Sequence, residues 1–211
     1  MSEIIVLIPS KNESTTLFKI LRNIKFKTVI INDGSTDGTE KKLRSLNIDF
    51  ITNQKTLGYE TSLLKGFKYI KKNYKKCRYI LTMDADGEHP PKYINKIINV
   101  ANVKNADLVM GYRSKYNRIS EYIISFFFNK KFGISDPLTG FKIYKAKKLY
   151  KFLNKVKSSY FLIDLLLLFK LANLKICKIN IQTKKRRSTS RVGSIIYSNI
   201  KIFLFIKFVF F

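Results

Sequence analysis

Short β-branched runs alternate with amphipathic stretches along the first half of the chain, and this alternation constrains the fold more than any other feature. Strands are expected over Ile4–Ile8, Thr28–Asn32, Asp49–Thr52, Tyr79–Met83 and Leu108–Met110. Helices are expected over Ser14–Asn23 with Ser14 as its cap, after Thr39 up to Leu46, over Gly58–Lys72, and from Pro91 to Ala101. This order predicts an α/β fold with a mostly parallel central sheet and helices on both faces.

The second half of the chain is less regular. Helices are expected over Arg118–Lys131 and Tyr160–Leu171, strands over Phe141–Tyr144 and Ile176–Gln182, and a basic loop over Lys184–Gly193. No linker rich in Pro or Gly interrupts the chain before about Ser194. We therefore predict one domain over residues 1–194.

Residues 195–211 form a separate zone of Ile, Phe, Leu and Val that is broken by Lys201 and Lys207. As a helix this zone would be about 25 Å long, against roughly 30 Å of bilayer hydrocarbon, so a full span is marginal. We predict a short apolar C-terminal helix that lies at a membrane, with its lysines reaching to the surface. The alternative is a core helix, which the apolar character of nearly every face disfavours.

The chain of 211 residues has 41 Lys and Arg against 14 Asp and Glu, a net charge of +27. Nucleic-acid binding, contact with an anionic membrane surface, and a Lys-rich genome composition without functional meaning each explain this charge. The sequence has no zinc finger, RNP-like aromatic motif or basic zipper, so nucleic acid is not expected as a partner. The opening residues do not resemble a secretory signal, which predicts a cytoplasmic location for the core.

Acidic side chains follow two of the predicted strands. Asp84 and Asp86 come directly after one strand, and Asp33 follows another. The carboxyl ends of parallel strands meet at one edge of an open sheet, where ligands bind. In an extended segment Asp84 and Asp86 point the same way and can share one hard cation, whose shell water and substrate phosphates complete. This arrangement predicts a site for a nucleotide diphosphate and a metal, with solvated turn carboxylates as the alternative.

Five motifs in this order resemble those of the family 2 inverting glycosyltransferases, in the branch that contains dolichyl-phosphate mannose synthase and bacterial polyprenyl-phosphate glucosyltransferases. The motifs are Ile8-Pro9-Ser10-Lys11-Asn12-Glu13, Ile31-Asn32-Asp33-Gly34-Ser35-Thr36-Asp37-Gly38-Thr39, Met83-Asp84-Ala85-Asp86-Gly87, Gly111-Tyr112-Arg113 and Asp136-Pro137-Leu138-Thr139-Gly140-Phe141-Lys142. The resemblance covers about residues 4–193. It implies a GT-A fold, a nucleotide-sugar donor such as GDP-mannose or UDP-glucose, Mg²⁺ or Mn²⁺ as cofactor, and a polyprenyl phosphate lipid as acceptor.

The resemblance also implies roles for residues on the donor side. By position, Pro9, Glu13 and Asp33 would line the nucleoside pocket, where a carboxylate accepts hydrogen bonds from ribose or base. Capping of a helix by Glu13 and turn formation by Asp33 are the alternatives. Asp84 and Asp86 would hold the metal and the diphosphate, and Glu88 stands where the family often has a third ligand. His89, the only histidine of the chain, is expected to be structural.

On the acceptor side, the resemblance implies that Arg113, Arg118 and Arg186 bind the acceptor phosphate, to which guanidinium groups pair in a bidentate way. Asp136 matches the candidate catalytic carboxylate of the family, so the predicted catalytic group is Asp136 with Arg113 and Arg186. A phosphate nucleophile is already ionised and needs little deprotonation. Orientation of the acceptor or of an arginine is therefore at least as good a role for Asp136 as that of a base.

Together these features predict a metal-dependent hexosyltransferase that moves mannose or glucose from a nucleotide diphosphate sugar to a polyprenyl phosphate with inversion. It would work at the cytoplasmic face of the membrane, as a peripheral or C-terminally anchored protein. An acceptor hydroxyl in cell-surface glycan synthesis is the alternative, and that reaction would need a true general base. A basic nucleic-acid-binding protein with a vestigial nucleotide site is the remote third possibility.

Overall fold

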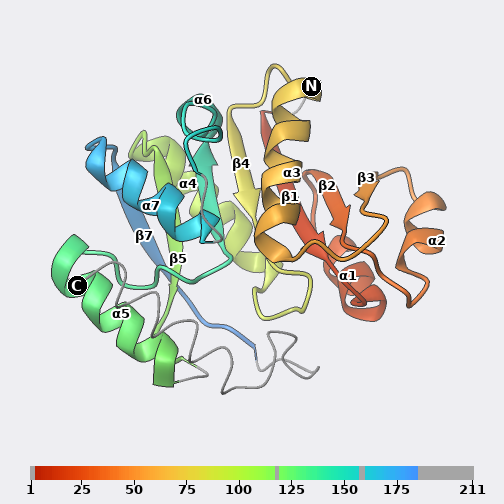
Figure 1. The fold of residues 1–211 in the computed structure, drawn as a ribbon, viewed down its shortest axis with the longest axis horizontal. Helices are drawn as coiled ribbons and strands as arrows, with labels where there is room; N and C mark the ends of the chain where they lie inside the picture. Colours follow the sequence, from red (N-terminus) through yellow and green to blue (C-terminus); the bar gives the residue numbers. More distant parts are fainter. Residues whose placement is uncertain (1–2, 117–118, 157–159, 185–211) are drawn as a thin grey trace.

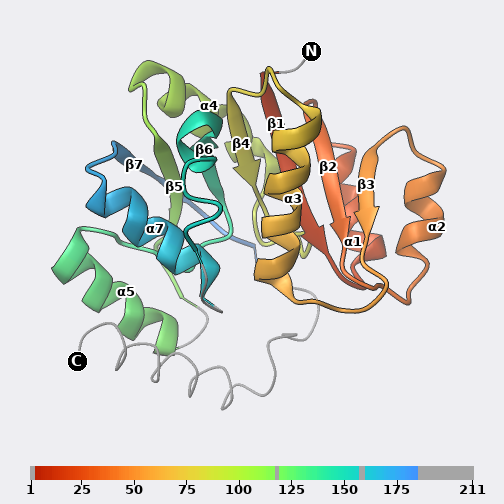
Figure 2. The ribbon, with the colours of Figure 1, turned by 45° about the horizontal axis from the view of Figure 1, so that its top comes forward.

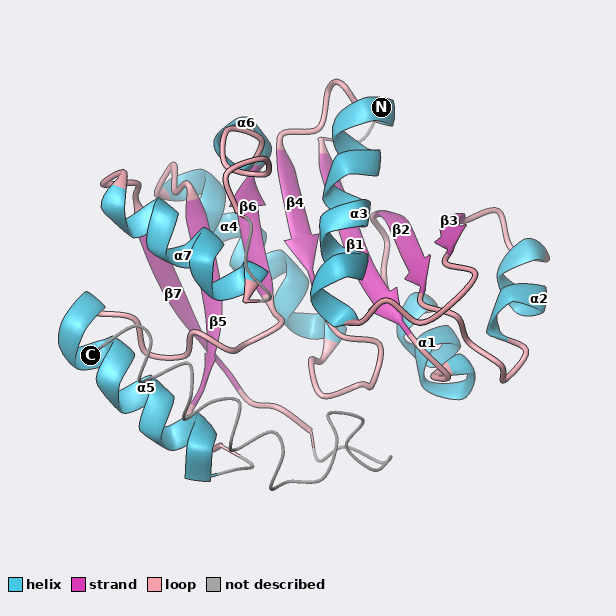
Figure 3. Cartoon of the chain, viewed as in Figure 1, coloured by secondary structure: helices cyan, strands magenta, loops and turns pink. Residues whose placement is uncertain are grey.

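The structure is a computed structural model and describes residues 3–116, 119–156 and 160–184 (Figures 1 and 3). The strands are β1 (Ile4–Ser10), β2 (Lys27–Asn32), β3 (Asp49–Thr52), β4 (Tyr79–Thr82), β5 (Leu108–Arg113), β6 (Lys142–Lys145) and β7 (Ile176–Ile181). The helices are α1 (Ser14–Leu21), α2 (Thr39–Arg44), α3 (Tyr59–Asn73), α4 (Ile94–Val103), α5 (Ile119–Phe132), α6 (Ala146–Leu149) and α7 (Phe161–Leu171), and the 3-10 turn η1 (Pro91–Tyr93) precedes α4.

The strands form one sheet in the order β3-β2-β1-β4-β6-β5-β7. Strands β3, β2, β1 and β4 are parallel neighbours, β5 and β7 are parallel to each other, and β6 runs antiparallel to both β4 and β5. Leu7 of β1 lies opposite Val29 of β2 and Thr82 of β4. This register brings the carboxyl ends of β1, β2 and β4 to the same edge of the sheet, as the sequence predicts.

Both faces of the sheet are covered by helices, which confirms the predicted fold class. Alternate residues of β1 point to opposite faces, so Ile5 and Leu7 join one core cluster while Val6 and Ile8 join the other. The first cluster includes residues of α3, α5, α6 and α7, and the second includes residues of α1, α2 and α4. Figure 2 shows α3 and α7 in front of the sheet. Helix α3 lies close to β1 at Gly66, where an added Cβ would collide with Leu7.

Several predicted boundaries are corrected by the structure. Strand β5 continues past Met110 to Arg113, and the short helix α6 was not predicted. Ser14 does not cap α1 through its side chain; its own N–H donates to Oδ2 of Asp37 at 2.9 Å, so the cap comes from the loop after β2. A distant carboxylate replaces the local cap because the loops after β1 and β2 lie side by side.

The predicted C-terminal helix and the domain boundary at residue 194 lie outside the described residues, as does most of the basic loop over Lys184–Gly193. Across the three described ranges, no helix is both long and apolar enough to cross a membrane.

Candidate active site

The carboxylate of Asp33 ties the end of β2 to the segment between β3 and α3. It is almost fully buried and accepts hydrogen bonds from Nδ2 of Asn53 at 2.8 Å and from the N–H groups of Leu57 at 2.8 Å and Gly58 at 2.9 Å. Burial acts to raise the pKa of Asp33, but these hydrogen bonds outweigh it and hold the pKa below its usual value. Because α3 begins at Tyr59, Asp33 holds the two residues that directly precede that helix.

The loops after β1 and β2 are joined by side chains. Ser35 Oγ accepts a hydrogen bond from the N–H of Asn12 at 2.9 Å, and Oδ1 of Asn12 accepts one from the N–H of Thr36 at 2.7 Å. The predicted nucleoside residues Pro9 and Glu13 stand beside this junction and are both buried. Their contact with a nucleoside stays a prediction.

A cavity of about 460 Å³ opens at the ends of β2 and β3. Its walls come from the two loops that follow these strands and from the first turn of α2, and its lining residues are Gly34, Ser35, Thr36, Glu40, Thr52, Asn53 and Gln54. None of the three predicted nucleoside residues is part of this lining. Asp33 directly precedes Gly34 of this lining, so the cavity opens next to one of the three predicted residues.

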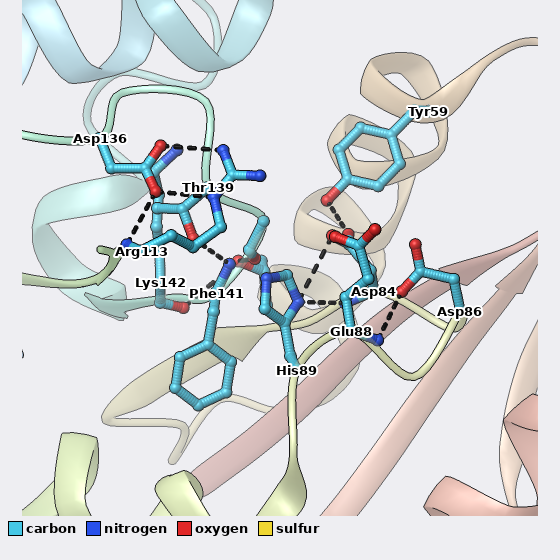
Figure 4. A network of polar contacts seen from close by, with 12 residues as sticks. Tyr59, Asp84, Asp86, Glu88, His89, Arg113, Asp136, Thr139, Phe141 and Lys142 are labelled. Carbon is cyan, nitrogen blue, oxygen red and sulfur yellow. Dashed lines mark hydrogen bonds and ion pairs between the residues drawn. The ribbon is translucent and has the colours of Figure 1, made fainter. Parts of the chain in front are cut away.

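Asp84 and Asp86 follow β4 at the predicted edge of the sheet (Figure 4). The strand ends at Thr82 and Asp86 lies in a turn, so the two carboxylates do not share the extended segment that the sequence predicts. Oδ1 of Asp84 accepts a hydrogen bond from the hydroxyl of Tyr59 at 2.6 Å, and Oδ1 of Asp86 accepts one from the N–H of Glu88 at 3.0 Å. Nδ1 of His89 accepts from the N–H of Asp84 at 3.4 Å. His89 is 2% exposed and packs on Phe141 with ring centroids 5.6 Å apart, which fits the structural role expected for it.

Two carboxylates at this position fit a hard divalent cation. Carboxylate oxygens are the ligands that Mg²⁺ and Mn²⁺ prefer, and Mg²⁺ keeps several waters and substrate phosphates in its shell. The backbone of Gly140 lies against both oxygens of Asp84, where an added Cβ would collide with them. No group of three or more His, Cys, Asp or Glu side chains is arranged as a metal site within the described ranges. Glu88 is thus not gathered with Asp84 and Asp86, and its role as a ligand stays a prediction.

Arg113 and Asp136 form a buried ion pair at the end of β5. Nε of Arg113 donates to Oδ2 of Asp136 at 2.8 Å, Nη2 donates to Oδ1 at 3.0 Å, and the backbone N–H of Arg113 donates to Oδ2 at 3.1 Å. Nη1 also donates to Oε2 of Glu121, on α5, at 3.3 Å. Burial acts to lower the pKa of Arg113, but these carboxylates outweigh it and raise that pKa further. Arg113 and Asp136, both predicted on the acceptor side, therefore bind each other. The other predicted acceptor-side residues, Arg118 and Arg186, lie outside the described residues.

Three residues that the sequence did not predict as site residues, Lys142, Glu60 and Tyr59, also lie near Asp84 or Asp136. Lys142 is 1% exposed, donates from Nζ to the carbonyl of Pro137 at 2.9 Å, and has its pKa lowered to about 8, mainly by burial. The negative charges of Asp136, Asp84 and Glu60 act to raise the pKa of Lys142. Glu60 accepts a hydrogen bond from the N–H of Phe161 at 2.8 Å, and burial raises its pKa to about 7.

The third of these residues is Tyr59, whose hydroxyl faces Asp84. Two local features of the sequence could have indicated Lys142, Glu60 and Tyr59 as site residues. A lysine follows the apolar Phe141 at the start of a predicted strand, and Tyr59 and Glu60 follow a glycine at the start of a predicted helix. Neither signal by itself specifies contact with Asp84 or Asp136, because those contacts depend on how α3 and β6 pack against β4.

The acidic pair Asp84 and Asp86 lies at the end of one strand, and the buried Arg113–Asp136 pair lies at the end of another (Figure 4). The buried amine of Lys142 is close enough to both pairs to be stabilised in its charged form by Asp84 and Asp136. Comparison with known sequences identifies the family. The profile named "Glycosyl transferase family 2" matches residues 5–153. The chain belongs to this family.

Two relatives show how far the likeness to known proteins extends. The uncharacterized protein MJ0544 of Methanocaldococcus jannaschii is 30% identical over 167 residues, which cover 69% of this chain and 72% of that protein. The dolichol-phosphate mannosyltransferase of Pyrococcus furiosus is 29% identical over 120 residues, which cover 51% of this chain and 32% of the relative. This chain thus matches about a third of the length of that mannosyltransferase.

Solved structures confirm the GT-A type of fold for this glycosyltransferase. The glucosyl-3-phosphoglycerate synthase of Mycobacterium tuberculosis superposes with a TM-score of 0.73 over 96% of this chain and 79% of that chain, at 16% sequence identity. That structure contains Mn²⁺, UDP and glucosyl-3-phosphoglycerate, and another structure of the same enzyme contains Mn²⁺ and UDP-glucose. At this identity the likeness establishes the shared fold.

Proposed function

We propose that this family 2 glycosyltransferase moves a hexose, mannose or glucose, from a nucleotide diphosphate sugar to the phosphate of a polyprenyl lipid. The anomeric carbon would be inverted, because the acceptor phosphate oxygen forms the new bond as the bond to the nucleotide diphosphate breaks on the opposite side. A divalent cation, Mg²⁺ or Mn²⁺, would neutralise the charge on the departing diphosphate. Asp84 and Asp86 are the residues that would hold it.

The Arg113–Asp136 pair carries this proposal. Both carboxylate oxygens of Asp136 accept hydrogen bonds from Arg113, and Asp136 is 1% exposed. A carboxylate held in this way is poorly placed to remove a proton from a hydroxyl acceptor. A phosphate acceptor is already ionised at neutral pH and needs no base. We therefore assign Asp136 the role of positioning Arg113.

Arg113 retains capacity to bind an acceptor phosphate. Within residues 3–116, 119–156 and 160–184, its contacts with Asp136 and Glu121 use three of the five guanidinium N–H groups. Lys142 adds a second buried cation in the field of Asp136. The partial match to a dolichol-phosphate mannosyltransferase supports the same acceptor class. The nucleoside would be bound by Pro9, Glu13 and Asp33, and further acceptor contacts would come from Arg118 and Arg186.

We propose further that the enzyme works at the cytoplasmic face of a membrane, on an anionic surface. The net charge of +27 favours such a surface, and a polyprenyl acceptor is confined to the bilayer. The apolar residues 195–211 would strengthen the attachment.

Parallel transfer assays test the donor and the acceptor together. Membranes containing the protein would be incubated with Mg²⁺ or Mn²⁺ and labelled GDP-mannose or UDP-glucose. Each donor would be offered polyprenyl phosphate, 3-phosphoglycerate or an oligosaccharide. We expect label from one donor to enter the organic phase only with polyprenyl phosphate, and EDTA to abolish it. Water-soluble labelled product with phosphoglycerate or oligosaccharide, and none in the organic phase, would overturn the lipid acceptor.

A further inference from the structure

Lys142 is a charged residue at a position of the sheet where a core side chain is expected. It is the first residue of β6, which lies between β4 and β5, and it is 1% exposed. A lysine is almost never fully buried unless its charge is balanced, and here the carboxylates of Asp84, Asp136 and Glu60 balance it. An apolar side chain would fill this place without the cost of burying a charge. The contacts of the amine are therefore what distinguishes Lys142 from an apolar residue.

The amine of Lys142 closes the loop that precedes β6. Its Nζ donates a hydrogen bond to the carbonyl of Pro137, five positions earlier, at 2.9 Å. Within the same loop, the N–H of Thr139 donates to the carbonyl of Asp136 at 3.4 Å. Lys142, Thr139 and Asp136 lie together in Figure 4. The side chain of Lys142 thus holds residues 136–141, which we call the 136–141 loop, against the start of its own strand.

The two ends of the 136–141 loop contact the two parts of the candidate active site. At one end, both carboxylate oxygens of Asp136 accept hydrogen bonds from Arg113. At the other end, the backbone of Gly140 lies against both carboxylate oxygens of Asp84. The loop therefore connects the arginine of the acceptor side to the carboxylate of the proposed metal site.

We infer that Lys142 is a positioning residue, which fixes the 136–141 loop and thereby the placement of Arg113 relative to Asp84. The inference rests on the proposed function, because that function assigns these two residues to the acceptor phosphate and to the metal. Attack with inversion needs the acceptor oxygen and the departing diphosphate on opposite sides of the anomeric carbon, so the two sites have to keep a fixed separation. Without the bond from Lys142, the buried carbonyl of Pro137 would lose this partner, and the loop would shift to find another.

A role of the charge alone would have the opposite consequence for the metal. The amine of Lys142 lies in the field of Asp84, so it repels a divalent cation bound there. Removal of the charge alone would therefore tighten the binding of Mn²⁺. A loosened 136–141 loop would weaken it, because Gly140 would no longer confine the carboxylate of Asp84. The sign of the change in metal affinity separates the two roles.

Hydrogen exchange of the full chain, read by mass spectrometry, tests the contact without any substrate. Lys142→Met replaces a buried ion with an apolar side chain of similar length, a change that buried sites often tolerate. Lys145→Met is the matched control on the same strand, where the amine donates to Oδ1 of Asn105 at 2.8 Å. We expect the amides of Thr139 and Phe141 to exchange about tenfold faster in the Lys142→Met protein, with β1 unchanged. Lys145→Met should leave the exchange of the loop as it is, and wild-type exchange in Lys142→Met would overturn the inference.

Thr82→Val loosens the same loop without changing any charge. The hydroxyl of Thr82 is buried and donates to the carbonyl of Gly140 at 2.8 Å. Both Thr82→Val and Lys142→Met should raise two quantities by about tenfold, the KM for polyprenyl phosphate and the Mn²⁺ concentration for half-maximal transfer. A merely structural role would lower the amount of active enzyme, and so kcat, and leave both concentrations unchanged.

Two other patterns would overturn the inference. A lower Mn²⁺ concentration for half-maximal transfer in Lys142→Met, with no change in Thr82→Val, would leave Lys142 the role of a charge alone. A raised KM for polyprenyl phosphate in Lys142→Met, with wild-type values otherwise, would show that the amine contacts the acceptor itself. Where Lys142→Met did not fold, wild-type exchange and wild-type Mn²⁺ response in Thr82→Val would overturn the inference.

The exchange experiment also separates this inference from the proposed function. Failure of the wild type to transfer sugar to polyprenyl phosphate would contradict the proposed function. The exchange of the 136–141 loop in the Lys142→Met and Lys145→Met proteins would still decide whether Lys142 holds that loop.

Discussion

The hydroxyl of Tyr59 lies 2.6 Å from Oδ1 of Asp84 and donates its hydrogen to that carboxylate. Tyr59 is the first residue of α3, and Asp84 follows β4, so this contact joins the start of a helix to the end of a strand. Burial of the hydroxyl and the nearby carboxylate raise the pKa of Tyr59 well above its usual value, so the phenol keeps its hydrogen. The position of Asp84 therefore depends on α3 as well as on its own strand.

Tyr59→Phe is expected to raise the Mn²⁺ concentration for half-maximal transfer by about tenfold, because hydrogen bonds to a metal-ligating carboxylate orient it. The measurement is a Mn²⁺ titration of transfer activity. Tyr69→Phe, on the same helix, is the control and should leave the titration unchanged. Equal titrations of the Tyr59→Phe and wild-type proteins would place this hydrogen bond outside the metal site.

Removal of the proposed metal or of its ligands should stop transfer. EDTA is expected to abolish activity and added Mn²⁺ to restore it. Asp86→Asn should lower activity by about 100-fold or more, since a neutral amide binds a hard cation less well than a carboxylate does. Asp49→Asn, which alters a half-exposed ion pair with Lys27 far from Asp86 in the sequence, should keep wild-type activity. Full activity of a folded Asp86→Asn protein would contradict the proposed site.

Asp136→Asn should lower the free energy of unfolding strongly and the transfer activity only in part. It leaves the buried Arg113 without its charged partner, which is expected to lower the free energy of unfolding by about 3 kcal/mol in a urea titration. Transfer to polyprenyl phosphate should fall through the misplacement of Arg113 and remain measurable. In the double variant with Arg113→Gln, part of the lost stability should return, because the unpaired charge is removed. Complete loss of turnover in a folded Asp136→Asn protein would instead indicate a general base, and with it a hydroxyl acceptor.

Glu60 should make stability depend on pH. Burial raises its pKa from 4.5 to about 7, so the folded protein binds this proton more tightly than the unfolded chain. The contribution of Glu60 to the free energy of unfolding therefore falls as pH rises from 4.5 to about 7, and the loss is complete above that range.

Glu60→Gln tests this dependence because glutamine keeps an oxygen for the N–H of Phe161. The variant is expected to be more stable than the wild type by about 3 kcal/mol near pH 8 and equal to it near pH 4. Urea titrations with EDTA present would measure both differences. Glu3→Gln, at an exposed position, should show no such difference between the two pH values. A constant difference for Glu60→Gln at all pH values would mean that its carboxyl does not titrate in this range.

Gly140→Ala should act through Asp84. Gly140 does not have a positive φ, so its backbone is not in the left-handed region, but an added Cβ would collide with both oxygens of Asp84. We expect about a tenfold loss of transfer and a weaker response to Mn²⁺. In a background of Asp84→Asn the same substitution should cause little further loss, because the two changes share one target. Additive losses would show that Gly140 acts elsewhere.

Local sequence patterns determined the sheet and its acidic edge. Runs such as Ile4–Ile8 are apolar at successive positions, which identifies strands buried on both faces, and their alternation with helices leaves few topologies besides a parallel sheet. Asp33, Asp84 and Asp86 follow such strands directly, so their common edge could be predicted from chain order. The five motifs identified the family, which the sequence comparison confirms.

Tertiary structure alone decided the partners of the buried polar groups. Asp33 accepts hydrogen bonds from residues 20 to 25 positions away in the sequence, and Arg113 donates hydrogen bonds to Asp136, which is 23 positions away. The burial of Lys142 likewise arises from how whole elements pack. Periodicity in a sequence records which face of an element is apolar, because that preference is local. The partner of a buried charge is set only when distant segments close on it, since desolvation and hydrogen bonding act between groups that the chain order keeps apart.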